Sequence, residues 1–402
     1  MRSFSSNLTA WLTSYAPNST TRSNIMNNIW DGFWYSVMVG LTQSFMGVYA
    51  LALGATDTML GWLTSLPALV SLLSHIPAAV ITERSPRRLR VSVPFGLVFR
   101  SSYLLYAFIP FMPVRPVLKA WTFIILIAVM NFPGTVSGSA WTAMMGDVFP
   151  SSIRGRVFGD RNMILGIATM VCTFVAGPFL DRLPYPINYT ILFATSFVAL
   201  MLSTYFQTKM IEGPQEAAAN TKKRGDGDGV RRALADQGFR FFLLALFVVH
   251  VGFNISASMW TILYVKVLGL SKTFIGSLSV LAQLTTVLTS RWWGRFADRH
   301  GNRLALFLSI AIFMPQPWLH NFVRTGWPLI PLNILSGLAG AGFGMVLFNA
   351  LLDISPDESI RPSYVAVFHT TMGITGFAAP LIGVALYQST NMGIVFILAT
   401  VL

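Results

Sequence analysis

Apolar runs of about twenty residues, separated by short polar turns, dominate the chain and restrict what it can fold into. A helix of that length spans the roughly 30 Å hydrocarbon core of a bilayer. Only 11% of the residues are charged and 54% are apolar, whereas about a quarter of the residues in a soluble domain are charged. One soluble core of this size could not hide so much apolar surface. The sequence therefore predicts an all-α protein immersed in lipid.

The apolar runs predict twelve membrane spans, of which the last is incomplete. Six spans precede the polar segment 209–238 and the others follow it. They are expected at 28–53, 58–82, 89–112, 117–146, 157–181, 187–208, 239–265, 273–297, 303–318, 328–352 and 362–387, with the last opening at 391 and cut short at Leu402.

Two segments lack the apolar pattern. Residues 1–27 are rich in Ser, Thr and Asn and have no apolar run before a small-residue cleavage site, so we expect a polar cytosolic tail and no signal peptide. Residues 209–238 contain an Ala run and a Gly-Asp repeat, which is typical of a solvated linker on the cytosolic side. The remaining residues form a bundle at 28–208 and a second at 239–402.

Basic residues give the chain a net charge of +13. A nucleic-acid partner would require these residues to be clustered on one folded face. With a cytosolic N-terminus, most of them instead fall on the inner loops and helix ends, and Arg100 lies inside a span. This positive-inside pattern predicts a multi-pass protein of the cytoplasmic membrane whose partner is the lipid bilayer and not a nucleic acid.

The two sets of spans share an internal repeat. At an offset of 215 residues, Arg84 and Arg88 align with Arg299 and Arg303, and the preceding helix aligns without gaps. At an offset of 206, the turn that begins at Asp147 aligns with the turn that begins at Asp353. The repeats predict a duplicated six-helix unit, with the halves related by an axis along the membrane normal.

The turn Gly294-Arg-Phe-Ala-Asp298-Arg299-His-Gly301-Asn-Arg303 resembles the signature between the second and third helices of each half in the major facilitator superfamily. The first-half copy, which runs from Ala79 to Arg88, departs from it at several positions. The resemblance implies two six-helix bundles that work by alternating access. It also implies ionic gating at these turns, with the candidates Glu83, Arg84, Arg88, Gly294, Asp298, Arg299, Gly301 and Arg303.

The same charges have a simpler interpretation, in which Arg299 and Arg303 only hold the turn in the cytosol. Glycine at position 301 is expected because helix ends often need a left-handed residue, which glycine adopts without strain.

The family resemblance also implies a polar cavity between the halves, lined by the first and fourth helices of each. His250, Asn254 and Ser258 recur at intervals of four and share one helix face. The repeat at an offset of 215 residues aligns His250 with Tyr35 and Ser258 with Gln43. The cavity candidates are Tyr35, Gln43, Asn131, Thr135, His250, Asn254 and Ser258. The alternative for each hydroxyl is a hydrogen bond to its own helix.

Ionisable residues inside the spans are costly in hydrocarbon and suggest ion coupling. Asp31, His75 and Arg100 could form one buried cluster, in which Asp31 exchanges a proton and Arg100 supplies the balancing charge. The alternative is a static ion pair. His250 and His369 are further titrating candidates.

No motif for an enzyme, a metal or a cofactor is present in the sequence. The sequence favours a secondary transporter of a small organic solute, neutral or anionic, and leaves proton coupling open. The alternative is a membrane sensor or assembly subunit that binds a ligand without moving it.

Overall fold

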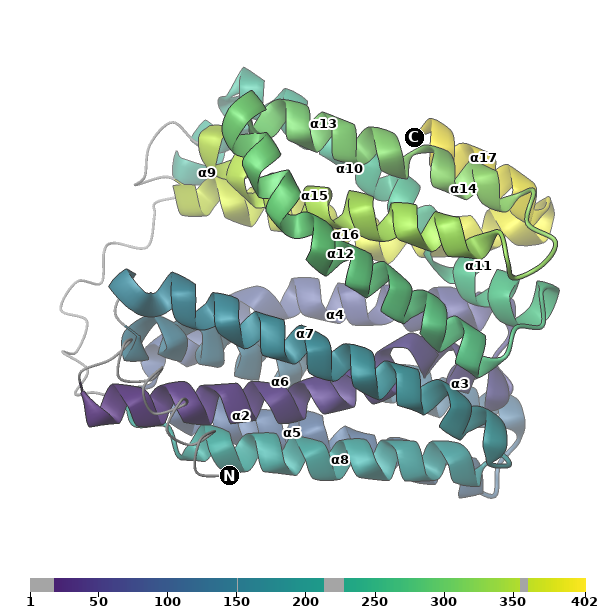
Figure 1. Ribbon diagram of the computed structural model, residues 1–402, viewed down its shortest axis with the longest axis horizontal. Helices are drawn as coiled ribbons and strands as arrows, with labels where there is room; N and C mark the ends of the chain where they lie inside the picture. The colour runs from purple at the N-terminus through teal and green to yellow at the C-terminus, as the bar shows by residue number, and fades with distance from the viewer. Residues whose placement is uncertain (1–17, 150, 213–227, 355–360) are drawn as a thin grey trace.

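Helices account for nearly all of the computed structural model, which describes residues 18–149, 151–212, 228–354 and 361–402 (Figure 1). The described residues contain no strand. Nine helical stretches among them are long and apolar enough to cross a membrane. The fold class expected from the sequence, an all-α membrane protein with two helical bundles, is confirmed.

The first bundle is formed by seven helices that match the first six predicted spans. They are α2 (Ser19–Thr42), α3 (Met46–Ala52), α4 (Asp57–Arg84), α5 (Leu89–Phe108), α6 (Pro116–Val148), α7 (Ser151–Arg182) and α8 (Ile187–Thr208). A 3-10 turn at Gln43–Phe45 divides the first span into α2 and α3. Tyr49 anchors the core of this bundle, because it is fully buried and its hydroxyl donates to the carbonyl oxygen of Tyr106 at 2.6 Å.

The second bundle is formed by eight helices. They are α10 (Gln237–Ile255), α11 (Ala257–Thr261), α12 (Lys272–His300), α13 (Asn302–Phe313), α14 (Pro315–His320), α15 (Leu329–Ile354), α16 (Arg361–Ser389) and α17 (Met392–Val401). A π-helix at Ile262–Val267 continues α11. The ninth span is interrupted before Pro315, since proline has no N–H for the helix ladder.

Two segments expected to be irregular contain helix. The predicted tail, residues 1–27, includes the start of α2, because the side chain of Asn18 accepts a hydrogen bond from the Thr20 N–H at 3.0 Å and caps the helix. The predicted linker, residues 209–238, includes α9 (Asp228–Ala235). Residues 1–17 and 213–227 lie outside the described residues.

The connections between helices define two ends of the molecule. We call the linker end the one that carries the α4–α5, α6–α7, α8–α9, α12–α13 and α15–α16 connections, and the opposite end the distal end. In Figure 1 the linker end is on the left, and α12 descends toward α7 as it approaches the distal end on the right. The bundles meet through α4 with α16 and through α7 with α12.

The close approach of the bundles depends on glycine at the contact. A Cβ on Gly177 of α7 would lie 2.7 Å from the Cα of Thr273 on α12, well inside van der Waals contact. A Cβ on Gly47 of α3 would lie 2.6 Å from the Oγ1 of Thr261 on α11. Both contacts lie in the distal half, where glycine lets the two backbones approach closely.

Candidate functional site

An ion pair lies buried inside the first bundle. Asp31 of α2 is 4% exposed and Arg100 of α5 is 7% exposed. The Nη2 of Arg100 lies 3.9 Å from the Oδ1 of Asp31. Asp31 also accepts hydrogen bonds from the Ser203 hydroxyl at 2.6 Å and from the indole Nε1 of Trp141 at 3.2 Å. The carboxylate therefore has partners on three other helices, as a buried charge requires.

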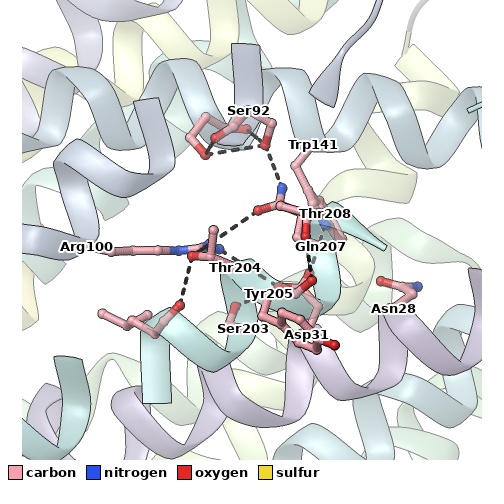
Figure 2. Close-up of polar contacts among 12 residues, drawn as sticks. Asn28, Asp31, Ser92, Arg100, Trp141, Ser203, Thr204, Tyr205, Gln207 and Thr208 are labelled. Atoms are coloured by element: carbon pink, nitrogen blue, oxygen red, sulfur yellow. Dashed lines mark hydrogen bonds and ion pairs between the residues drawn. The ribbon is translucent and has the colours of Figure 1, made fainter. Parts of the chain in front are cut away.

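Arg100 is held from its other side by α8. Its Nη1 donates to the hydroxyl of Thr204 and to the Oε1 of Gln207, the latter at 3.2 Å. The Nε2 of Gln207 donates in turn to the hydroxyl of Ser92 at 2.7 Å. Figure 2 shows the chain running from Asp31 through Arg100 and Gln207 to Ser92. This continuous network fixes the guanidinium in one position.

A cavity of about 510 Å³ opens beside this network, and we call it the arginine cavity. It is enclosed by α2, α5, α6, α7 and α8 of the first bundle. Its described lining is Asp31, Tyr35, Ser36, Val39, Phe99, Arg100, Gly134, Ser137, Gly138, Trp141, Thr142, Arg161, Leu165, Thr169 and Gln207. Tyr35 remains 39% exposed, so solvent reaches the site in this conformation.

Arg161 of α7 is a charged residue of this cavity that the sequence analysis missed, because it was grouped with the basic residues of the inner loops and helix ends. The helix begins at Ser151, which places Arg161 about 15 Å along it. Its guanidinium carbon lies 5.0 Å from the centre of the Trp141 ring, and its Nε donates to the carbonyl oxygen of Asn28 at 3.3 Å. Two guanidinium groups and one carboxylate thus line the same cavity.

A second cavity, of about 490 Å³, lies between the two bundles. We call it the interbundle cavity. Four of the predicted cavity residues line it: Tyr35, Gln43, Asn131 and Ser258. Ser258 of α11 donates to the carbonyl oxygen of Leu60 on α4 at 3.1 Å, which links the bundles directly. Tyr35, Val39 and Phe99 line both cavities, so the two spaces adjoin.

The other predicted cavity residues are placed elsewhere. Thr135 donates to the carbonyl oxygen of Asn131 on its own helix, at 2.8 Å, which is the alternative the sequence left open. His250 and Asn254 contact each other through their side chains at 3.4 Å, and His250 packs against Phe343. None of these three lines the arginine cavity or the interbundle cavity.

His75 does not join the buried cluster with Asp31 and Arg100, so that part of the expected grouping is wrong. Its side chain is exposed, and its Nδ1 contacts the carbonyl oxygen of Ser71 one turn back on α4. The neighbouring Ser74 is buried, so the register of α4 turns His75 away from the bundle interior.

The predicted gating residues lie at the linker end. Glu83, Arg84, Asp298, Arg299 and Arg303 are exposed. Two ion pairs join the bundles at the distal end, Asp57 with Lys266 (2.6 Å) and Asp181 with Lys272 (3.4 Å). In this conformation the distal end is therefore closed by ion pairs. The gating role of the linker-end charges stays a prediction.

Three further residues of the turns have local roles here. Arg88 donates to the carbonyl oxygen of Thr82, and its Nε lies 3.8 Å from Asp147 within the same bundle. A Cβ on Gly294 would lie 3.0 Å from the Cε of Met345, so glycine allows α12 to approach α15. Gly301 has the expected positive φ, +87°, and with ψ 153° it adopts a backbone conformation that is essentially restricted to glycine.

Comparison with known proteins adds to this geometry. The sequence model of the Major Facilitator Superfamily matches residues 32–272 and 242–402. A class H tetracycline resistance protein of Pasteurella multocida is 22% identical over 253 residues, which are 63% of this chain and 62% of that protein. The match thus spans less than two thirds of the relative's length.

Solved structures of transporters share the fold. A mutant of the nucleoside transporter NupG has a TM-score of 0.73 at 11% identity, covering 94% of this chain and 96% of that one. A D-xylose-proton symporter has a TM-score of 0.66 at 13% identity and covers 95% of both chains. A bacterial homologue of the human lysosomal transporter Spinster has a TM-score of 0.63 at 14% identity, covering 92% of this chain and 82% of that one. At these identities the likeness concerns the fold alone.

Proposed function

Because the chain belongs to the major facilitator superfamily, we propose that it carries a small organic solute across the cytoplasmic membrane by alternating access. Family membership makes it a multi-pass membrane transporter and not an enzyme. The basic residues at the linker end support a cytosolic linker end and a cytosolic N-terminus, by the positive-inside rule. The distal end then faces outward.

The observation that carries the proposal is the closure of the distal end beside two cavities. The bundles are joined at the distal end by Asp57 with Lys266 and by Asp181 with Lys272. At the linker end the side chains of Glu83 and Asp298 are exposed. Tyr35 is 39% exposed about midway along the first span, where it lines both cavities. A solute in either cavity would therefore be separated from the distal side of the membrane, as alternating access requires in one half of the cycle.

Protons are the coupling ion that we propose, with Asp31 as the group that gains and loses one. It is the carboxylate of the arginine cavity, and its neighbours Ser203 and Trp141 would hold either protonation state in place. The static ion pair with Arg100 is the alternative. The xylose-proton symporter is a structural neighbour that couples to protons, while the nucleoside transporter and the tetracycline resistance protein differ from it in substrate.

Counterflow in proteoliposomes tests the carrier function. Purified protein is first screened against small organic solutes for thermal stabilisation, and a stabilising solute is then loaded in excess inside sealed vesicles. A carrier draws labelled solute inward against its own gradient, whereas a sensor or assembly subunit that only binds the solute gives no exchange. Absence of counterflow with a solute that demonstrably binds would leave the second class as the function.

The Asp31→Asn variant separates coupling from carriage. Counterflow needs no net movement of protons, so it is expected to persist in the variant. Accumulation driven by a pH gradient is expected to be lost. Undiminished pH-driven accumulation in Asp31→Asn would exclude Asp31 as the coupling group and favour the static pair.

A further inference from the structure

The arginine cavity contains one positive charge that no described side chain of its lining neutralises. That lining includes three charged side chains: Asp31, Arg100 and Arg161. Asp31 and Arg100 form an ion pair at 3.9 Å. While Asp31 is ionised, the two charges of that pair balance each other. The cavity then holds one excess positive charge, that of the Arg161 guanidinium, inside a membrane bundle where an unneutralised charge is costly.

Arg100 is not available to bind a solute. Its Nη1 donates to Thr204 and Gln207 on α8, and its Nη2 faces Asp31. Turning toward the cavity would break these contacts and leave the buried carboxylate of Asp31 without its cation, which is strongly unfavourable.

Arg161 is available, by contrast. Within the described residues only its Nε donates a hydrogen bond, to the carbonyl oxygen of Asn28 at 3.3 Å. The planar group lies against the Trp141 ring at 5.0 Å, which fixes its orientation. Its two terminal nitrogens remain as a fork of donors at the cavity, and this is the geometry that matches a carboxylate with two parallel hydrogen bonds.

Gly32 makes room for this placement. A Cβ at position 32 would lie 2.6 Å from the Nη2 of Arg161 and 2.8 Å from its Cζ. Any larger side chain on this face of α2 would push the guanidinium away from its position over Trp141. The position of the charge is thus determined by Gly32 on one side and by Trp141 on the other.

The rest of the lining is suited to an apolar body. Val39, Phe99, Leu165 and the ring of Tyr35 face the same space of about 510 Å³, which is within the range of small-molecule sites. We infer that the solute is an organic monocarboxylate, whose carboxylate is bound by Arg161 and whose apolar part lies against α2, α5 and α7. This inference names the substrate class of the proposed carrier and rests on that function.

The experiment measures binding by isothermal titration calorimetry on the purified full chain. The probes are aliphatic and aromatic monocarboxylates, each paired with its neutral carboxamide and its cationic amine, together with phosphate monoesters as dianions. Carboxylates are expected to bind at least about tenfold more tightly than their paired amides. They are also expected to bind more tightly than phosphate monoesters, because one unmatched cation is balanced by one negative charge.

Variants assign the binding to Arg161. Arg161→Gln is expected to weaken carboxylate binding by about tenfold or more, and Arg161→Lys to retain part of it. Gly32→Ala keeps the charge but displaces the guanidinium, so it is expected to weaken binding with Arg161 still present. Arg156→Gln removes an exposed arginine from the same helix and is the matched control, with binding as in the unmodified protein.

Three results would each overturn the inference: amides or amines that bind best, carboxylates that bind Arg161→Gln as well as the unmodified protein, or a panel in which no carboxylate binds. Counterflow keeps the two proposals apart. If carboxylates bind through Arg161 but show no counterflow, the carrier function is refuted and the binding site stands. If a neutral solute shows counterflow that is the same in Arg161→Gln, the carboxylate site is refuted and the carrier function stands.

Discussion

Replacing Asp181 with Ala is expected to shift the protein toward the conformation that opens at the distal end. Asp181, at the end of α7, accepts hydrogen bonds from the N–H groups of Lys272 and Thr273 at 3.1 and 2.8 Å, and from the Thr273 hydroxyl at 2.7 Å. One carboxylate of the first bundle thus caps the N-terminus of α12 in the second. These hydrogen bonds exist only while the distal ends are together.

The magnitude follows from the helix cap and the ion pair that the substitution removes. A carboxylate cap on a helix N-terminus contributes about 1 kcal/mol, and the exposed pair with Lys272 adds roughly 0.2 to 1 kcal/mol. Loss of about 1.5 kcal/mol from the distal-closed state raises the population ratio of distal-open to distal-closed molecules about tenfold. Helix α12 itself should remain folded, because Ser271 still caps it by accepting from the Phe274 N–H at 3.1 Å.

Spin labels at the distal end measure this population. Tyr185 and Trp327 are 45% and 74% exposed and lie on distal connections of opposite bundles, so both can be replaced by labelled cysteine once Cys172 is changed to Ser. Double electron–electron resonance should then show a second, longer distance between the labels, and the fraction of molecules with that distance should increase in Asp181→Ala. Arg182→Gln alters the adjacent exposed residue and should leave the distances unchanged. Loss of thermal stability in Asp181→Ala without any gain of the longer distance would show that Asp181 does not hold the distal end closed.

Three further variants test the packing, each by its melting temperature in detergent. Arg100→Gln leaves the Asp31 carboxylate buried without its cation and should cost about 3 to 5 kcal/mol; recovery in the double variant with Asp31→Asn is the check. Gly342→Ala should cost about 1 to 3 kcal/mol, since its Cβ would lie 2.6 Å from the fully buried Trp293, and an unchanged melting temperature would contradict that contact. Asp236→Ala should cost about 1 kcal/mol, because it removes the cap of α10. The Phe239 N–H hydrogen bond lowers the pKa of Asp236. The cap therefore stabilises the protein fully at a pH above the ordinary pKa of a carboxyl group, and this stabilisation disappears as the pH falls below that range. A melting temperature that is still lower in Asp236→Ala than in the unmodified protein in strong acid would contradict this.

The helices were predictable because lipid imposes a simple rule on sequence. Each backbone polar group must be satisfied within its own helix, so spans appear as long apolar runs. The interruptions were harder to predict. The 3-10 turn at Gln43–Phe45 has neither proline nor glycine to mark it, and α9 lies in a segment whose composition is typical of a linker.

The site was only partly predictable, because the sequence shows which charged residues are costly to bury in the membrane but not which way their side chains point. Asp31 and Arg100 stood out as charges in apolar surroundings, and they do pair. His75 stood out for the same reason but faces outward on α4. Arg161 and Asp181 lie near the ends of the predicted span 157–181, where charges are ordinary. Their roles depend on contacts with α6 and α12 that no local pattern contains.

The duplicated halves are not chemically equivalent, and this bears on how a charged solute could be carried. The offset of 215 places Leu246 at the position of Asp31. One residue is inserted in the turn that begins at Asp353, so the offset becomes 207 after it and places Phe368 at the position of Arg161. Leu246 and Phe368 are both buried in one apolar cluster of the second bundle. A carboxylate held by Arg161 would therefore bind to the first bundle alone, while the second bundle offers neutral groups such as Ser258. The second bundle could then rotate past the bound solute without separating an ion pair, so the energetic barrier to reorientation would come from the distal contacts at Asp57 and Asp181 and not from the binding site.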